Sequence, residues 1–279
     1  MFSLRTNKNK AWLIEPSAFS ELARRVIEAK ATMAGDFVEE MCDEMEAERA
    51  LCIDPLAPGL AMLSVEGVLY YGATQKEECF WGLYDPQRIL NAVETVRDDA
   101  SIKALAIMID SPGGYVTAIK ETAEAVHALS ASKPVIFYTP QLCASAAYWI
   151  AAAGNSLHAA PFADIGSIGV YATLIDDCDF WKQNGFAFTY IRDGKYKAMG
   201  STGKPYTDDE VQLITDSVQA CSESFKGAIG SMRPQVTAEQ MQGQCFAASD
   251  PAAAGMVDSV QFRTAADFLS YAAKVAANL

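Results

Sequence analysis

The stretch KPVIFYTPQLCASAAYWIAAAG, residues 133–154, decides the fold. Its first part is a short apolar run with β-branched and aromatic residues, which predicts a buried strand. Its last part is a run of small residues that predicts a tightly packed helix. Ser145 stands at the junction between the two. The sequence therefore predicts a lone hydroxyl at the first turn of a helix, directly after a strand.

The same alternation of strands and helices continues along the chain from Ala61, which indicates an α/β domain with a largely parallel sheet. Strands are expected at residues 61–71, 104–110, 134–139, 156–160 and 187–192. Helices are expected at residues 86–99, 116–129, 145–153, 177–184, 207–229 and 237–243, with a closing helix from Thr264. We therefore predict an α/β core over residues 56–262 and a C-terminal helix over residues 263–279.

The N-terminal residues differ from this pattern. Residues 17–50 have helical spacing of apolar residues with an acidic face, and DPLAPGL then marks a boundary. We predict an acidic helical arm over residues 1–55. Two interpretations stay open: a solvated amphipathic helix packed on its neighbour, or an arm that contacts a partner subunit.

Composition excludes several classes of protein. The chain has 279 residues, of which 51% are hydrophobic, and 35 acidic against 22 basic residues give a net charge of −13. Such a charge disfavours binding to nucleic acid or to an anionic membrane surface. Seven cysteines without a CxxC pair predict neither a zinc site nor a disulfide framework. No apolar run approaches the ~18 residues that span a bilayer, so we expect a cytoplasmic protein without a metal.

Two predicted strand ends carry candidate chemistry. After the strand at residues 104–110, Gly113 and Gly114 allow the backbone to approach a ligand closely, and their N–H groups could bind an oxyanion. The alternative is a plain turn with Ser111 or Asp110 as a helix cap. At the second strand end, Ser145 could be an acyl-transfer nucleophile, with its own N–H or that of Ala146 as a further donor. The alternative is an ordinary helix cap.

A nucleophilic serine needs a base, and the sequence leaves its identity open. The chain has two histidines, of which His127 is expected to be solvated and His158 to be a core residue. Lysine is the other known base for serine, provided that burial lowers its pKa. Lys195 and Lys197 follow a predicted strand, and their two-residue spacing places both on one strand face. Cys143 is a rival nucleophile that more often serves as a small buried hydrophobe.

Three segments in this order, DSPGGYV, CASAAYWIAA and IRDGKYKAMGS, resemble the signal peptide peptidase A family of serine-lysine proteases over residues 60–262. The resemblance implies a Clp protease/crotonase-like fold. It also implies roles for single residues: Ser145 is the nucleophile, Lys197 the general base, and Gly114 with Gly113 beside it and Ala146 form the oxyanion hole. No cofactor or metal is implied.

Within that family the chain most resembles the soluble phage prohead (capsid maturation) proteases. The resemblance implies a serine endopeptidase that cleaves polypeptides, with phage capsid or scaffold proteins as partners, a homo-oligomer, and a location in the cytoplasm or within a prohead in the host cell. One departure is Ala146-Ala147, where many members have glycines.

Three alternatives remain open. A crotonase-like acyl thioester enzyme would use the same oxyanion hole with a carboxylate near the glycine turn. A structural assembly protein would keep the site without activity. A cysteine hydrolase would use Cys143 and His158.

Overall fold

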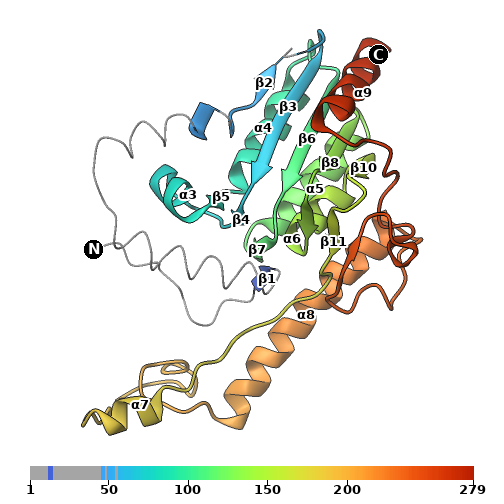
Figure 1. Ribbon diagram of the computed structural model, residues 1–279. Helices are drawn as coiled ribbons and strands as arrows, with labels where there is room; N and C mark the ends of the chain where they lie inside the picture. Colours follow the sequence, from blue (N-terminus) through green and yellow to red (C-terminus); the bar gives the residue numbers. More distant parts are fainter. Residues whose placement is uncertain (1–11, 15–44, 48, 54–55) are drawn as a thin grey trace. The chain divides into compact units, whose positions relative to one another are not determined.

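The computed structural model describes residues 12–14, 45–47, 49–53 and 56–279 (Figure 1). Most of the predicted N-terminal arm therefore lies outside the described residues, and within it residues 45–47 are helical. The described chain divides into two units. We call Val170–Ser224 the arm unit, which is distinct from the predicted N-terminal arm. Leu13–Gly169 with Phe225–Leu279 is the core unit.

The core unit is built on a five-stranded sheet with the order β10-β8-β6-β3-β2. Its strands are β3 (Leu60–Glu66), β6 (Ala104–Asp110), β8 (Val135–Thr139), β10 (Ser156–Ala159) and the antiparallel edge strand β2 (Cys52–Ile53). β10, β8, β6 and β3 run parallel. β8 is buried along its whole length, as expected for a parallel strand covered on both faces.

Helices cover this sheet (Figure 1). They are α4 (Gln87–Asp98), α5 (Ile119–Ser130), α6 (Ala146–Ala152) and α9 (Ala265–Ala277). Helix α3 (Gln75–Trp81) lies beside the short strand Leu83–Tyr84 instead, and a 3-10 turn is formed by Pro251–Ala253. α9 packs on the face that carries Ala104, Ala106, Ile136 and Tyr138. Side chains alternate along a strand, so the neighbouring residues of β6 and β8 point to the opposite face. The predicted α/β class, with a largely parallel sheet and flanking helices, is confirmed.

Two smaller sheets surround the carboxyl ends of the central strands. One has the order β1-β7-β4-β5, from β1 (Trp12–Ile14), β7 (Gly113–Tyr115), β4 (Val68–Leu69) and β5 (Leu83–Tyr84). The other has the order β12-β11-β9, from β12 (Cys245–Ala247), β11 (Asp164–Gly166) and β9 (Leu142–Ala144). The strand predicted at residues 61–71 is split between two sheets at Gly67, whose φ is 107°. A Cβ there would lie 2.2 Å from the carbonyl oxygen of Gly82, so the bend requires glycine.

The arm unit contains α7 (Cys178–Gln183) and the first part of α8 (Asp208–Met232). The strand predicted at residues 187–192 is wrong, because this segment has no strand partner. Phe188 of this segment and the preceding Phe186 pack against Trp181 instead, with ring centroids 5.6 and 5.5 Å from that of the tryptophan. The short helix predicted at residues 237–243 is also wrong: the core unit has turns there.

No helix in the described part of the chain is long and apolar enough to cross a membrane.

Candidate active site

Ser145 has a strained backbone. It joins β9 to α6 with φ 54° and ψ −120°, a conformation that is ordinarily restricted to glycine. Its side chain is 1% exposed and makes no capping hydrogen bond to the helix. A serine that only caps a helix sits in the β region and accepts a bond from the first turn. The geometry at Ser145 is therefore a sharp strand-to-helix turn and not an ordinary helix cap, as expected for the candidate nucleophile.

Neighbouring strands hold this turn in place. On one side β9 pairs in parallel with β11, and the Ser145 N–H donates to the carbonyl oxygen of Gly166 at 2.7 Å. On the other side, the N–H of Ala144 donates to the carbonyl of Ser111 at 3.1 Å. The N–H of Ser111 donates in turn to the carbonyl of Leu142 at 2.8 Å. These bonds fix the segment on both edges, which is what a strained residue needs in order to persist.

The glycine turn lies beside the nucleophile. Ser111, two residues before Gly113, pairs in parallel with Cys143, two residues before Ser145. β7 also contacts α6. A Cβ on Gly114 would lie 1.9 Å from the carbonyl oxygen of Leu69, so the turn can approach β4 only with glycine at this position. The structure thus brings together four of the five predicted site residues: Gly113, Gly114, Ser145 and Ala146.

The hydrogen bonds around the turn narrow the choice of oxyanion donors. The Gly113 N–H already donates to Ser111 Oγ at 3.2 Å. Ala146 is the first residue of α6, and a first-turn N–H has no acceptor within its own helix. The N–H of Trp149 is the one that bonds to the Ser145 carbonyl, at 3.0 Å. Gly114 and Ala146 are therefore the better candidates for the two donors.

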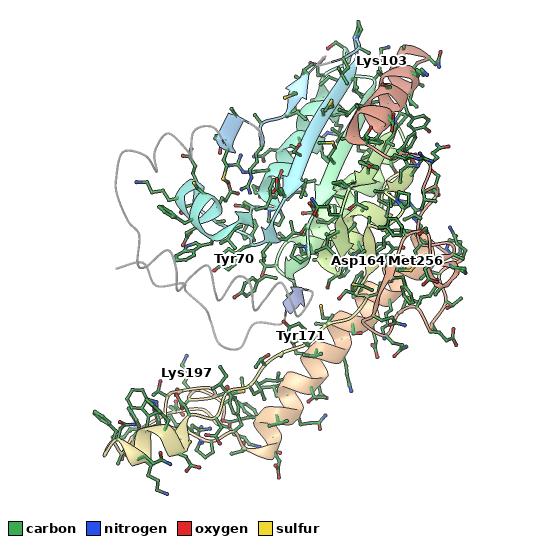
Figure 2. The ribbon with its side chains drawn as sticks, in the orientation of Figure 1. Tyr70, Lys103, Asp164, Tyr171, Lys197 and Met256 are labelled. Atoms are coloured by element: carbon green, nitrogen blue, oxygen red, sulfur yellow. The ribbon has the colours of Figure 1, made fainter. Side chains whose placement is uncertain are left out.

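The two candidate lysines lie in the arm unit, where Lys197 is labelled in Figure 2. Lys195 forms an ion pair with Asp209 and lies over the Tyr196 ring, 5.2 Å from its centroid. The hydrogen bond to Asp209 raises the pKa of Lys195, which makes it a poor source of a neutral amine. Lys197 is exposed, and its N–H donates to the Gly194 carbonyl at 3.3 Å. Because Lys197 and Ser145 belong to different units, their pairing stays a prediction.

The remaining titratable candidates have structural surroundings. Burial raises the pKa of the Cys143 thiol, which is fully buried and so stays protonated at neutral pH. His158 bonds through Nδ1 to Ser259 Oγ at 2.9 Å, and its ring packs edge-on against Phe262. His127 is exposed on α5. These surroundings favour the structural interpretation of all three residues.

Ser167 is a site residue that the sequence analysis missed. It directly follows Gly166, whose carbonyl accepts the Ser145 N–H, and it is a buried non-glycine residue with φ 50°. Its N–H donates to the Gln244 carbonyl at 2.8 Å. The available signal was a Gly-Ser pair after a short apolar segment, but β11 has three residues and was not predicted as a strand.

Within the described residues, no group of three or more His, Cys, Asp or Glu side chains could hold a metal ion.

Comparison with known proteins identifies the family of the chain. The family model described as Peptidase family S49 matches residues 127–276, more than half of the chain. The chain therefore belongs to peptidase family S49, and the predicted resemblance to signal peptide peptidase A proteins is confirmed.

Curated relatives carry protease names. The chain is 30% identical over 179 residues to "Putative protease MJ0651" of Methanocaldococcus jannaschii, covering 63% of this chain and 58% of that protein. It is 29% identical over 178 residues to the chloroplastic serine protease SPPA of Arabidopsis thaliana (62% and 26%). It is 23% identical over 167 residues to capsid assembly protease C of Escherichia phage lambda (60% and 38%). The chain thus spans 58% or less of the length of these three relatives.

Among solved structures, the chain is similar to an enoyl-CoA hydratase/isomerase family member, with 13% identity and a TM-score of 0.42. The match covers 82% of this chain and 74% of that one. This similarity is too weak to assign the fold, which is assigned from the sheet described above.

Proposed function

We propose that this chain is a serine endopeptidase in which Ser145 is the nucleophile and Lys197 the general base. The observation that carries the proposal is the strained backbone of Ser145 beside a glycine turn. Strain of this kind costs about 1–3 kcal/mol and clusters at functional sites. Membership of a peptidase family and the protease names of its relatives support the reaction class.

In the proposed reaction, the neutral amine of Lys197 takes the proton from Ser145 Oγ as the oxygen attacks a peptide carbonyl carbon. The N–H groups of Gly114 and Ala146 stabilise the oxyanion that forms. Lys197 then gives its proton to the leaving amine as the C–N bond breaks. Water hydrolyses the resulting acyl-enzyme and releases Ser145.

The base needs desolvation to act. A lysine is neutral near pH 7 only if burial lowers its pKa, and Lys197 is exposed. We propose that cover for the amine comes when the site is completed, by bound substrate or by a neighbouring subunit of a homo-oligomer. Activity would then depend on assembly.

The proposed substrate is an extended polypeptide that pairs with the backbone beside the glycine turn, at the edge of β7 that β1 occupies in the structure, so binding requires β1 to move away. A more specific hypothesis is that the substrate is a phage capsid or scaffold protein. The similarity to capsid assembly protease C of phage lambda supports this hypothesis. Under it, the proposed reaction would take place in the cytoplasm or within a prohead in the host cell.

One observation favours a second candidate, an acyl thioester enzyme. Such an enzyme needs a carboxylate near the glycine turn, and Asp110 ends β6 just before it. Burial and the neighbouring Glu66 raise the pKa of Asp110. Saturable binding of acyl-CoA by the purified protein, lost in Asp110→Asn, would favour this function.

The test is labelling of the purified full chain with a fluorophosphonate probe, followed by mass spectrometry of the labelled peptide. We expect label on Ser145, none on Ser145→Ala, and a rate at least about 10³-fold lower in Lys197→Ala, because nucleophile and base act as a unit. Lys195→Ala is the matched control and should stay within about threefold of the wild type, since its amine is held by Asp209. Equal losses in both lysine variants would contradict the assignment of the base. A folded wild-type protein that takes no label would favour the thioester or structural alternatives.

A further inference from the structure

We infer that Ser111 is a positioning residue of the oxyanion hole, an inference that rests on the proposed function. Ser111 lies between β6 and the glycine turn and is fully buried. It touches no reacting atom in the proposed mechanism. Its role would be to set where the Gly114 N–H lies relative to Ser145.

The Ser111 side chain joins two separate segments. Its hydroxyl donates to the carbonyl oxygen of Gly67 at 2.7 Å and accepts the N–H of Gly113 at 3.2 Å. One hydroxyl can do both, because it has one donor and two acceptor lone pairs. The bend between β3 and β4 is thereby linked to the residue that precedes the candidate donor Gly114.

The Ser111 main chain joins a third segment, the nucleophile strand β9. The Ser111 N–H donates to Leu142 and its carbonyl accepts from Ala144, at 2.8 and 3.1 Å. A single residue thus makes four hydrogen bonds to the parts that form the site. An alanine could keep the two backbone bonds, but it would release both bonds of the hydroxyl.

Strand pairing also restrains the glycine turn, because β7 pairs with β4 at Gly114 and Leu69. Gly113 has φ 89°, and without a Cβ it has access to a wide range of φ and ψ. The hydroxyl of Ser111 restrains the peptide before Gly113, and the pairing of β7 with β4 restrains the chain after it. The orientation of the Gly114 N–H depends on both restraints. Gly67 also has a restrained position, because its N–H donates to the Asp110 carbonyl at 3.1 Å. The hydroxyl of Ser111 therefore links the glycine turn to Gly67, whose position is itself held by a hydrogen bond.

A misplaced oxyanion donor lowers the rate of the chemical step more than it lowers substrate binding. Loss of one such donor costs about 10²–10³ in kcat. Ser111→Ala would displace the donor rather than remove it, so we expect a fall of about 10–100-fold in kcat with KM within about twofold. Affinity for a peptidyl boronate, whose tetrahedral adduct places an oxygen in the oxyanion hole, should fall by a similar factor.

The experiment compares wild type, Ser111→Ala and Ser259→Ala for peptide hydrolysis and boronate inhibition, with folding checked by thermal unfolding. Ser259→Ala is the matched control, since it also removes a serine hydroxyl bonded to a buried partner, His158. Ser111→Cys is the second variant if Ser111→Ala does not fold, because a thiol keeps most of the volume but bonds weakly. A fall confined to kcat and boronate affinity in the Ser111 variants supports the inference.

Two results would overturn it, and they are distinguishable. If folded Ser111 variants keep wild-type kcat and boronate affinity while Ser145→Ala is inactive, the positioning role is refuted and the protease proposal stands. If the wild type neither hydrolyses peptides nor binds the boronate at Ser145, both proposals fail together.

Discussion

Replacing Ser145 by glycine should stabilise the protein while it abolishes the reaction. The residue has φ 54° and ψ −120°, and its hydroxyl makes no capping bond, so the wild-type side chain brings strain without a compensating helix cap. Ser145→Ala removes the hydroxyl but keeps the Cβ and therefore the strain. Ser145→Gly removes both. The difference between the two variants isolates the backbone strain.

The expected magnitude follows from two opposing terms. Relief of the strained conformation contributes about 1–3 kcal/mol. The extra freedom of glycine in the unfolded chain costs about 0.5–1 kcal/mol. With the middle of each range, we expect the free energy of unfolding of Ser145→Gly to exceed that of Ser145→Ala by about 1 kcal/mol, which corresponds to a Tm higher by about 2–4 °C for a protein of this size.

The assay is thermal unfolding of both variants, together with urea denaturation, at the same protein concentration. Ala151→Gly is the matched control, because it places glycine in the same buried helix at a position whose backbone is helical. That change should lower stability by about 1 kcal/mol relative to wild type. A Ser145→Gly protein that is no more stable than Ser145→Ala would refute the strain and, with it, the main support for Ser145 as nucleophile.

Three further outcomes are expected. Gly114→Ala should slow fluorophosphonate labelling more than about 100-fold, because the added Cβ would lie 1.9 Å from the Leu69 carbonyl oxygen. Gly227→Ala in α8 is the control and should have no effect, because there is open space around Gly227. Similar labelling rates of the two variants would contradict the predicted turn. Cys143→Ala should leave the labelling rate within about threefold of wild type, because burial keeps the thiol protonated, and a complete loss would revive the cysteine alternative. Burial lowers the pKa of His158 below its ordinary value of 6.5, so the folded protein binds this proton less readily than the unfolded chain. The corresponding stability is present above pH 6.5 and is lost as the pH falls below it, by up to about 1.4 kcal/mol per pH unit; urea midpoints at pH 7.5 and 5.5 should therefore differ more for wild type than for His158→Gln, and equal differences would count against this prediction.

The long central strands could be predicted from the sequence because each is a continuous apolar run. β6 matches its predicted bounds at residues 104–110, and β8 begins one residue after its predicted start. The short strands β7, β9 and β11 have three residues each, which is too few to give a periodic signal. These strands form because the tertiary fold brings other strands close enough to pair with them, and the local sequence does not show this. The same reason explains why the strand predicted at residues 187–192 does not form. Phe188 of this segment packs against Trp181, and the segment has no strand partner.

The candidate site was predictable where its chemistry is local. The positions of Gly113, Gly114 and Ser145 follow from motifs of a few residues at strand ends. The choice between Lys195 and Lys197 could not be made from spacing, because the residue that distinguishes them, Asp209, lies outside the motif. Ser167 was missed because its place beside Ser145 depends on the pairing of β9 with β11.

The anchoring of α6 explains why a lone serine stands between a strand and an alanine-rich helix. All seven residues of α6 are buried. The Trp149 ring stacks on Phe225 with centroids 4.7 Å apart, and the hydroxyl of Tyr148 donates to the Met256 carbonyl at 2.9 Å. Small residues at 146 and 147 let the helix start close to β7. Packing fixes α6 after Ser145, and strand pairing fixes β9 before it. The single residue between them must therefore adopt a strained backbone conformation to connect the two. A helix that only needed a cap would have relaxed to the ordinary capping geometry, so the retained strain agrees with the proposed role of Ser145 better than with a role in stability.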